Sequence, residues 1–229
     1  KEDGSFYAVY DAKNNKLIDN GEKWSTQSGC LHAKLSIGLT NLYELTQDKK
    51  YLDSAKKVCD NSLRFLKNDG RFVTFSESGD TLFHPHCYAI EGLYVAGNYF
   101  NNKKYLEIAK QSIIYLFNQQ LKNGGIPQIF QNGKFIEFER SDILAQALRL
   151  GVLFLQDIDN KKLEKLVKRL LEFQNLKEEQ KGGFMYGFDS FGKKYEHLNS
   201  WCTMFALQAL ELYKQSLENK LNFDGFLMV

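Results

Sequence analysis

The 229-residue sequence has few cysteines, and they do not form recognisable pairs. Cys30, Cys59, Cys87 and Cys202 lie far apart, and no CxxC spacing occurs. Disulfide frameworks and common zinc modules use closely spaced cysteines, so the pattern excludes a disulfide scaffold. We therefore expect a reducing compartment, and the cytoplasm is the predicted location.

The sequence also lacks long apolar runs and an excess of one charge. No run approaches the roughly 18 apolar residues of a membrane-spanning helix. The 30 basic and 28 acidic side chains leave a net charge of +2. Lysines alternate with acidic residues, as in 161–165, which indicates solvated helix faces rather than a basic stripe. Neither a membrane nor a nucleic acid is an expected partner.

One type of loop-to-helix junction recurs along the chain. Its fullest form, 84–93, places two histidines, a thiol, a phenol and a carboxylate in ten residues (HPHCYAIEGL). Related junctions surround Cys30, Asp142 and Cys202, each before an apolar segment. The spacings between successive junctions are 87 − 30 = 57, 142 − 87 = 55 and 202 − 142 = 60. A period of roughly 50–60 residues indicates a repeat architecture.

Each repeat predicts a helical hairpin. An apolar segment follows each junction, and in the first three repeats a short polar turn and an amphipathic segment come next. Glycines such as Gly38, Gly92 and Gly151 punctuate the apolar segments and allow close helix packing. We predict seven main helices: an apolar inner set at 28–46, 86–100, 141–156 and 200–217, and an outer set at 50–67, 103–121 and 160–174.

Glycine-containing loops separate the repeats. Asp3-Gly4, Asp69-Gly70, Gly124-Gly125 and Gly182-Gly183 each precede a short aromatic or β-branched run, and Asp224-Gly225 is a candidate fifth. Glycine in the left-handed region commonly ends a helix, so we expect each loop to stop a helix and continue as an extended segment.

This plan resembles the α/α toroids, which include six-hairpin glycosidases, polysaccharide lyases and epimerases, and the prenyltransferase and terpene-cyclase barrels. The resemblance implies an all-α toroid with its ligand in a funnel at the N-terminal ends of the inner helices. Seven helices are fewer than a complete toroid has, and Lys1 falls inside a repeat. We therefore expect one toroid-like domain over 1–229, a piece of a longer toroid that associates with a neighbouring molecule or with further helices.

The junctions contain the candidate site residues, among them all four histidines of the chain. Histidine suits proton transfer near neutral pH, and arginine presents a fork to a carboxylate or phosphate. The candidate catalytic residues are His86, Tyr88, Glu91, Arg140 and Asp142. The candidate substrate-binding residues are Trp24, His32, His84, Glu139, Gln146, His197, Asn199 and Trp201.

Structural roles are open for the same residues. His32 and His84 can bond loop backbone, Asp142 can be an N-cap, and Glu91 can hold a structural hydrogen bond. Arg140 can pair with Glu139 or with Glu137. Trp24 and Trp201 can stack on a sugar or pack beneath the loops, and most of the chain's 18 Phe and 12 Tyr are expected to fill the core.

No cofactor is expected, although some toroids hold zinc through Cys, His and Asp ligands. The residues for that alternative are Cys87, Cys202 and His86, and Cys30 is a further candidate ligand. No ligand-pair spacing such as CxxC supports them. Buried cysteines with no metal are the competing interpretation.

The leading functional hypothesis is a carbohydrate-active enzyme (a lyase, C5-epimerase or hydrolase) that acts on an acidic glycan. In the lyase or epimerase case His86 or Tyr88 removes the proton next to the uronate carboxylate and Arg140 neutralises that carboxylate. Hydrolysis would draw two carboxylates from Asp142, Glu139 and Glu91. The loop 124–127 followed by Ser141 and Gln146 is faintly similar to glucuronyl C5-epimerases.

Two other functions remain open. One is a non-catalytic glycan- or protein-binding scaffold. The other is isoprenoid processing, for which the Asp-x-Asp at 157–159 is the candidate, although it lies at an inner-to-outer turn.

Overall fold

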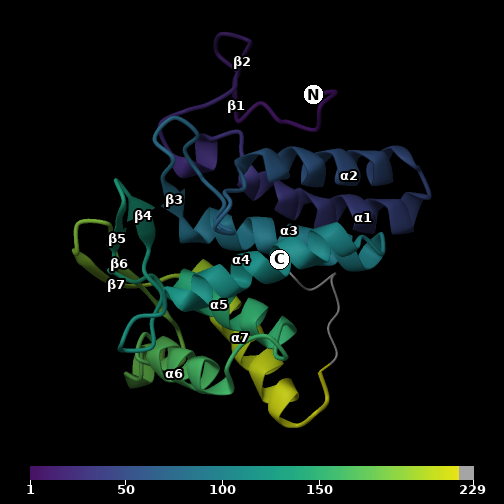
Figure 1. Ribbon diagram of the computed structural model, residues 1–229. Helices are drawn as coiled ribbons and strands as arrows, with labels where there is room; N and C mark the ends of the chain where they lie inside the picture. Colours follow the sequence, from purple (N-terminus) through teal and green to yellow (C-terminus); the bar gives the residue numbers. More distant parts are fainter. Residues whose placement is uncertain (222–229) are drawn as a thin grey trace. The chain divides into compact units, whose positions relative to one another are not determined.

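The computed structural model describes residues 1–221, which contain seven α-helices and short β-hairpins. The described residues divide into two compact units, 1–112 and 113–221. Figure 1 shows the elements with their labels. Over the described part of the chain, no helix combines the length and the apolar character needed to cross a membrane.

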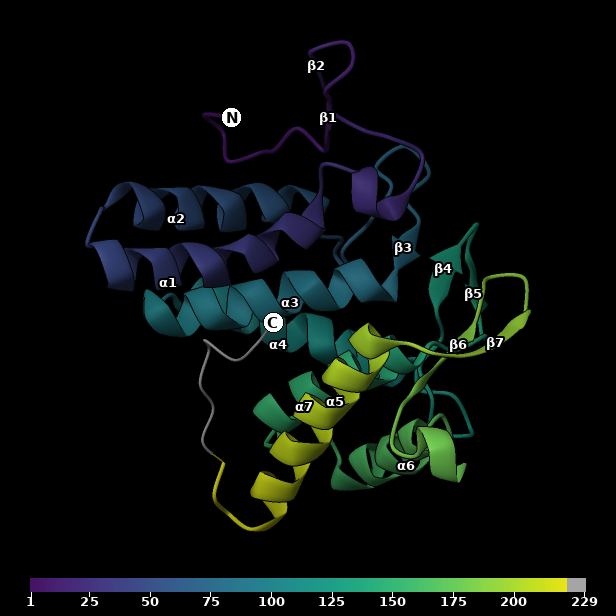
Figure 2. The same cartoon turned by 180° about the vertical axis from the view of Figure 1, so that it is seen from behind.

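The first unit is built on two neighbouring inner helices and one outer helix. Helix α1 (Leu35–Thr46) follows a 3₁₀ turn, η2 (Cys30–Lys34), and α2 (Lys50–Ser62) runs back alongside it. Helix α3 (Phe83–Tyr99) packs against η2 and α1. Figures 1 and 2 show α1 between α2 and α3, as the repeat predicts.

Glycine determines how closely the two inner helices approach. A Cβ on Gly92 of α3 would lie 2.1 Å from the backbone oxygen of Ala33 in η2, so only glycine allows this contact. The predicted close approach is confirmed there. It is wrong at Gly38, where nothing lies within 4 Å of an added Cβ.

The second unit repeats the hairpin. Helix α4 (Lys103–Asn118) carries the chain into it, and α5 (Ser141–Leu153) packs against α6 (Asn160–Leu171) and α7 (Ser200–Leu217). Helix α5 is buried almost throughout, whereas α6 buries only one leucine stripe. All seven predicted helices are present, most with ends within a few residues of the expected ones.

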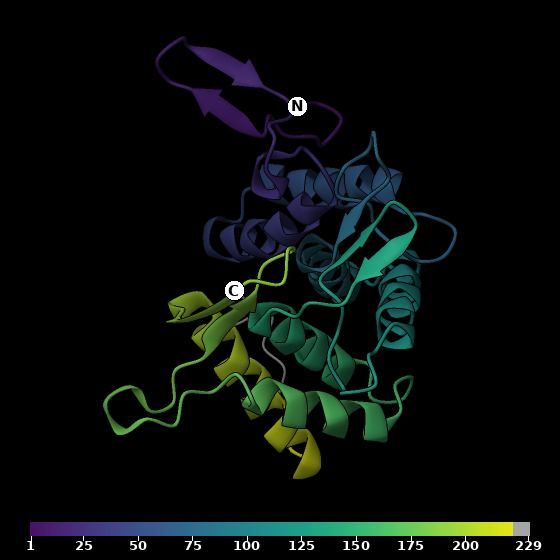
Figure 3. The ribbon, with the colours of Figure 1, turned by 90° about the vertical axis from the view of Figure 1, so that its left-hand side faces the viewer.

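The extended runs continue into β-hairpins whose returning arms the sequence did not reveal. Strand β1 (Val9–Asp11) pairs with β2 (Lys16–Ile18), β4 (Ile129–Gln131) with β5 (Lys134–Ile136), and β6 (Met185–Phe188) with β7 (Lys194–Leu198). Figure 3 shows the β1–β2 hairpin extending from the helices of its unit. Residues 69–75 form no strand, and only the short β3 (Thr81–Leu82) follows them.

The loop glycines behave as predicted. Gly4, Gly70, Gly124 and Gly182 have φ values of +81°, +91°, +92° and +95°, in the left-handed region that favours glycine. The candidate fifth loop at Asp224-Gly225 lies outside the described residues.

Candidate functional site

Three aromatic rings gather at the junction in the first unit. Trp24 lies in the 3₁₀ turn η1 (Trp24–Thr26), and His84 and Tyr88 lie one turn apart on α3. The His84 and Tyr88 ring centroids are 4.4 Å apart, and Trp24 is 5.0 Å from His84 and 6.4 Å from Tyr88. Trp24 and Tyr88 are half-buried. A stacking surface is therefore present at the N-terminal end of an inner helix.

A buried ion pair lies beside these rings. The Lys34 Nζ is 2.8 Å from Glu91 Oε2, and the Glu91 side chain is fully buried. The same ammonium lies 4.5 Å from the centroid of the Tyr88 ring. A phenol, a carboxylate and an ammonium are thus held together. Of the two side chains that α3 contributes, Tyr88 is more accessible than Glu91.

Lys34 was not among the sequence candidates, although the repeat contains a signal for it. Lys34 is four residues after Cys30, Glu91 is four after Cys87, and Gln146 is four after Asp142. Lys34 and Glu91 are therefore one repeat apart (91 − 34 = 57) and meet across the η2–α3 contact. Opposite charges at equivalent positions of neighbouring repeats predict such a pair.

His86 lies in the core and connects backbone segments. Its Nδ1 accepts a hydrogen bond from the Phe72 amide at 3.2 Å, and its Nε2 faces the Ser112 carbonyl at 3.3 Å. These partners fit a neutral ring with the proton on Nε2. Burial lowers the pKa of His86 to about 4, and none of its surface is exposed. This position does not support the catalytic hypothesis for His86.

His32 is also engaged locally. Its Nδ1 accepts from the Gly29 amide at 3.4 Å, its ring packs against Phe6 at 5.1 Å, and burial lowers its pKa. The loop-bonding interpretation describes these contacts well.

In the second unit, an arginine and an aspartate form a forked pair. Arg140 Nε lies 3.1 Å from Asp142 Oδ1, and Nη2 lies 2.5 Å from Oδ2. The guanidinium stacks over the Tyr186 ring at 4.8 Å, and Tyr186 stacks on His197 at 5.8 Å. Burial alone would lower the pKa of Arg140, but Asp142 and Tyr186 raise it, so the charge is retained.

These contacts correct two interpretations. Arg140 pairs with Asp142 and not with Glu139 or Glu137. Asp142 is not the N-cap of α5, because the N-cap position is Arg140 and Asp142 is the second helical residue. His197 lies on β7, where it is exposed.

Glu139 has a separate, structural partner. Arg169 on α6 donates from Nε to both Glu139 carboxylate oxygens at 3.0 Å, and Asn123 adds a bond at 3.2 Å. A Cβ on Gly125 would fall 1.5 Å from Glu139 Oε1. The Gly124-Gly125 loop is thus shaped around this buried pair. Sequence reasoning missed Arg169 because it lies on a helix face expected to be solvated.

The remaining candidates differ in accessibility. Asn199 caps α7 by accepting from the Cys202 amide at 3.1 Å. Trp201 is 46% exposed and packs on Phe205 at 5.3 Å, so it is available to a ligand. Gln146 is fully buried.

The cysteines are buried thiols. Burial raises the pKa of Cys30 to about 12; burial and then Asp142 raise that of Cys202 to about 11. Within residues 1–221, no three His, Cys, Asp or Glu side chains come together as metal ligands. Asp159 of the isoprenoid alternative caps α6.

Comparison with known proteins finds similarity in structure and none in sequence. No family model matches the sequence, and no curated protein is similar to it. Solved structures do match. An α-1,6-mannanase of Salegentibacter sp., solved with α-1,6-mannotriose, gives a TM-score of 0.70 at 14% identity over 95% of this chain. Cellobiose 2-epimerase from Bacillus thermoamylovorans gives 0.62 at 16% over 89%, and an unsaturated glucuronyl hydrolase specific for heparin gives 0.60 at 19% over 82%.

The chain spans 60%, 55% and 54% of those three structures, respectively. At these identities the likeness establishes architecture only. The chain has the all-α, α/α-toroid fold that is shared by glycosidase, epimerase and lyase structures.

Proposed function

We propose that this chain is a carbohydrate-active enzyme that transfers a proton on an acidic glycan, as a lyase or C5-epimerase does. The observation that carries the proposal is the group formed by Tyr88, Lys34 and Glu91, flanked by the rings of Trp24 and His84. Toroid structures named for epimerase and polysaccharide lyase activities support a carbohydrate substrate, and the structure named as a glucuronyl hydrolase supports an acidic one.

Tyr88 is the proposed base. Its ring is half-buried and borders Trp24 and His84, so a sugar stacked on these rings would lie near the phenol oxygen. The Lys34 ammonium, 4.5 Å from the ring centroid, stabilises negative charge that develops on the phenol. Glu91 holds the ammonium in place.

The reaction begins when the ionised phenol oxygen of Tyr88 takes the proton at C5, next to the uronate carboxylate. The electrons of the C–H bond move toward that carboxyl group. In an elimination they then form the C4–C5 double bond while the C4–O bond breaks, and the departing oxygen takes the proton that Tyr88 removed from C5. In an epimerisation C5 instead receives a proton from water on the opposite face, and the Tyr88 phenol returns its own proton to the solvent.

Hydrolysis is less well supported by the geometry. A general acid must be protonated before it acts, and it needs a second carboxylate as its partner. The Glu91 carboxylate is paired with Lys34 and the Asp142 carboxylate with Arg140, so both are already engaged by a cation. Glu139 is bonded to Arg169.

The second unit offers another surface suited to a sugar. Tyr186 and His197 provide stacked rings, and Trp201 at the start of α7 is 46% exposed. Arg140 retains N–H groups beyond the two used by Asp142, which suits hydrogen bonds to hydroxyl or carboxylate oxygens. We propose that this surface, within the second unit, binds a sugar residue.

The test is turnover of uronate-containing polysaccharides by the wild type and Tyr88→Phe. Elimination gives ultraviolet absorbance from the unsaturated product, and proton exchange at C5 gives deuterium incorporation in heavy water. Loss of the proton-transfer group is expected to reduce turnover by roughly 10²–10⁴-fold with binding retained. Tyr94→Phe, another phenol on α3, is the matched control.

Either of two outcomes would count against the proposal. If the wild type acts on no acidic glycan by either readout, the proton-transfer function is wrong, and a binding or scaffold role takes its place. If turnover persists in Tyr88→Phe, Tyr88 is not the base.

A further inference from the structure

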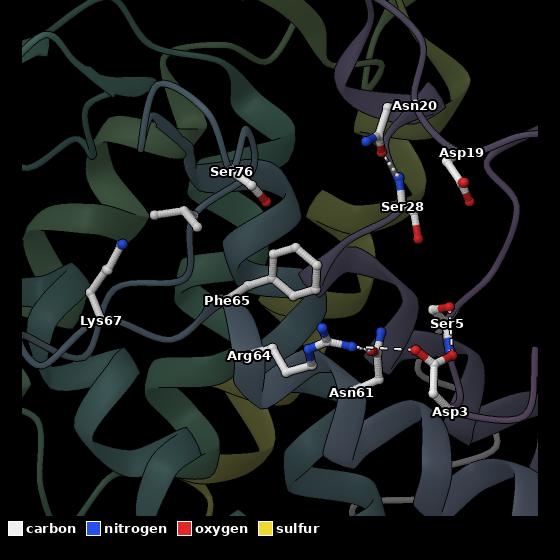
Figure 4. Close-up of a pocket in the computed structure, with 11 residues that line it drawn as sticks. Asp3, Ser5, Asp19, Asn20, Ser28, Asn61, Arg64, Phe65, Lys67 and Ser76 are labelled. Atoms are coloured by element: carbon white, nitrogen blue, oxygen red, sulfur yellow. Dashed lines mark hydrogen bonds and ion pairs between the residues drawn. The ribbon is translucent and has the colours of Figure 1, made fainter.

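The first unit contains a cavity that shares no lining residue with the Tyr88 group. Its volume is about 490 Å³. It lies at the C-terminal end of α2 and the following turn η3 (Leu63–Phe65), beside the segment that leads to η2. Figure 4 shows its lining side chains.

The walls combine one aromatic ring with fixed polar groups. The half-buried Phe65 is held close to Gly29, where an added Cβ would lie 3.7 Å from the ring. Asn20 accepts from the Ser28 amide at 3.0 Å, and Asn61 accepts from Arg64 at 3.3 Å. Both amides are thereby oriented and keep donors for a ligand. A ring face bordered by amides and hydroxyls matches a pyranose, which has apolar C–H faces and a polar rim.

The charges of the cavity nearly cancel, with one exception. Asp3 pairs with Arg64 at 3.3 Å, and Asp19 pairs with Lys1. Lys67 also lines the cavity, but no carboxylate among residues 1–221 pairs with it. The cavity therefore has an ammonium available to an anionic group of a ligand.

We propose that this cavity is a second glycan-binding site, which holds a pyranose carrying a carboxylate. The sugar ring stacks on Phe65, the hydroxyls bond Asn20, Asn61 and Ser28, and the carboxylate pairs with Lys67. The inference takes its ligand class from the proposed function, but it does not require catalysis. The site would hold a glycan residue apart from the one that reacts.

Backbone amide NMR shifts test this site directly, with methyl glucuronoside as the probe. We expect saturable shifts at Ser28, Phe65 and Ser76. Lys67→Ala should weaken the fitted affinity by roughly tenfold, as for loss of a charged hydrogen bond. Methyl glucoside and acetate, which each lack one recognised half, should bind more weakly. Lys49→Ala, at the opposite end of α2, is the control and should leave the affinity unchanged.

Equal affinity for glucuronoside and glucoside, or an unchanged affinity in Lys67→Ala, would overturn the inference. Phe65→Leu provides a second test of stacking, with spectral dispersion as the check on folding. Shifts near Trp24 and Tyr88 alone would refute this site and leave the proposed function standing. Shifts at Ser28 and Phe65 without any turnover of acidic glycans would refute the proposed function and leave this site standing.

Discussion

Replacement of Lys34 by methionine is expected to lower the free energy of unfolding by about 3–5 kcal/mol, the usual cost of removing one partner of a buried ion pair. The Glu91 side chain is fully buried, and the Lys34 side chain is 17% exposed. Methionine keeps the apolar stem but removes the positive charge that stabilises the carboxylate. Thermal unfolding measures the loss, and a decrease on the order of 10 °C in Tm is expected.

A double-mutant cycle measures the interaction energy between Lys34 and Glu91 separately from their contacts with other residues. Glu91→Leu combined with Lys34→Met replaces both charges by apolar groups and should recover most of the loss. Lys50→Met removes an exposed pair with Asp48 and should change Tm little. A Tm for Lys34→Met equal to that of the wild type would show that the pair does not hold the site together.

Substitution of Gly92 by alanine is the second change with a large expected effect. The new Cβ would lie 2.1 Å from the Ala33 oxygen and 2.6 Å from the Lys34 amide nitrogen. No side-chain rotation relieves a clash with backbone, so α3 must move away from η2. Overpacking costs about 1–3 kcal/mol and more in rigid places, so we expect a loss of about 3 kcal/mol.

Gly38→Ala is the matched control, because Gly38 is also in an inner helix but has open space around it. Alanine there should raise the free energy of unfolding by about 0.5–1 kcal/mol, from helix propensity alone. Denaturant unfolding of the two variants should therefore give changes of opposite sign. A stable Gly92→Ala protein would contradict the close contact between α3 and η2.

The helices could be predicted from the sequence because the same pattern occurs in each successive repeat. Apolar segments, polar turns and loop glycines agree with one another, and Gly4, Gly70, Gly124 and Gly182 all adopt the expected left-handed conformation. Helix α3 begins at Phe83, three residues before the predicted start at 86, and includes Pro85 in its first turn. Proline fits the first turn of a helix, where the missing N–H costs little.

The site could be predicted only in part, because its contacts depend on which segments fold over it. His86 has the residue type of an acid–base group, yet the loop bearing Phe72 covers it and uses its ring nitrogens. Arg169 looked solvated in sequence, but it reaches Glu139 across the unit. The returning arms of the hairpins, such as 16–18, are too short to show strand periodicity.

The most direct test of the central claim, that a glycan binds at the inner-helix junctions, uses the chain's two tryptophans. Trp24 and Trp201 each lie at one junction, so Trp201→Phe and Trp24→Phe leave one fluorescent reporter apiece. We predict that acidic oligosaccharides change the emission of Trp24 in a saturable manner, and more strongly than neutral ones do. If no acidic or neutral oligosaccharide changes the emission of either tryptophan in folded protein, glycan binding at these junctions is contradicted.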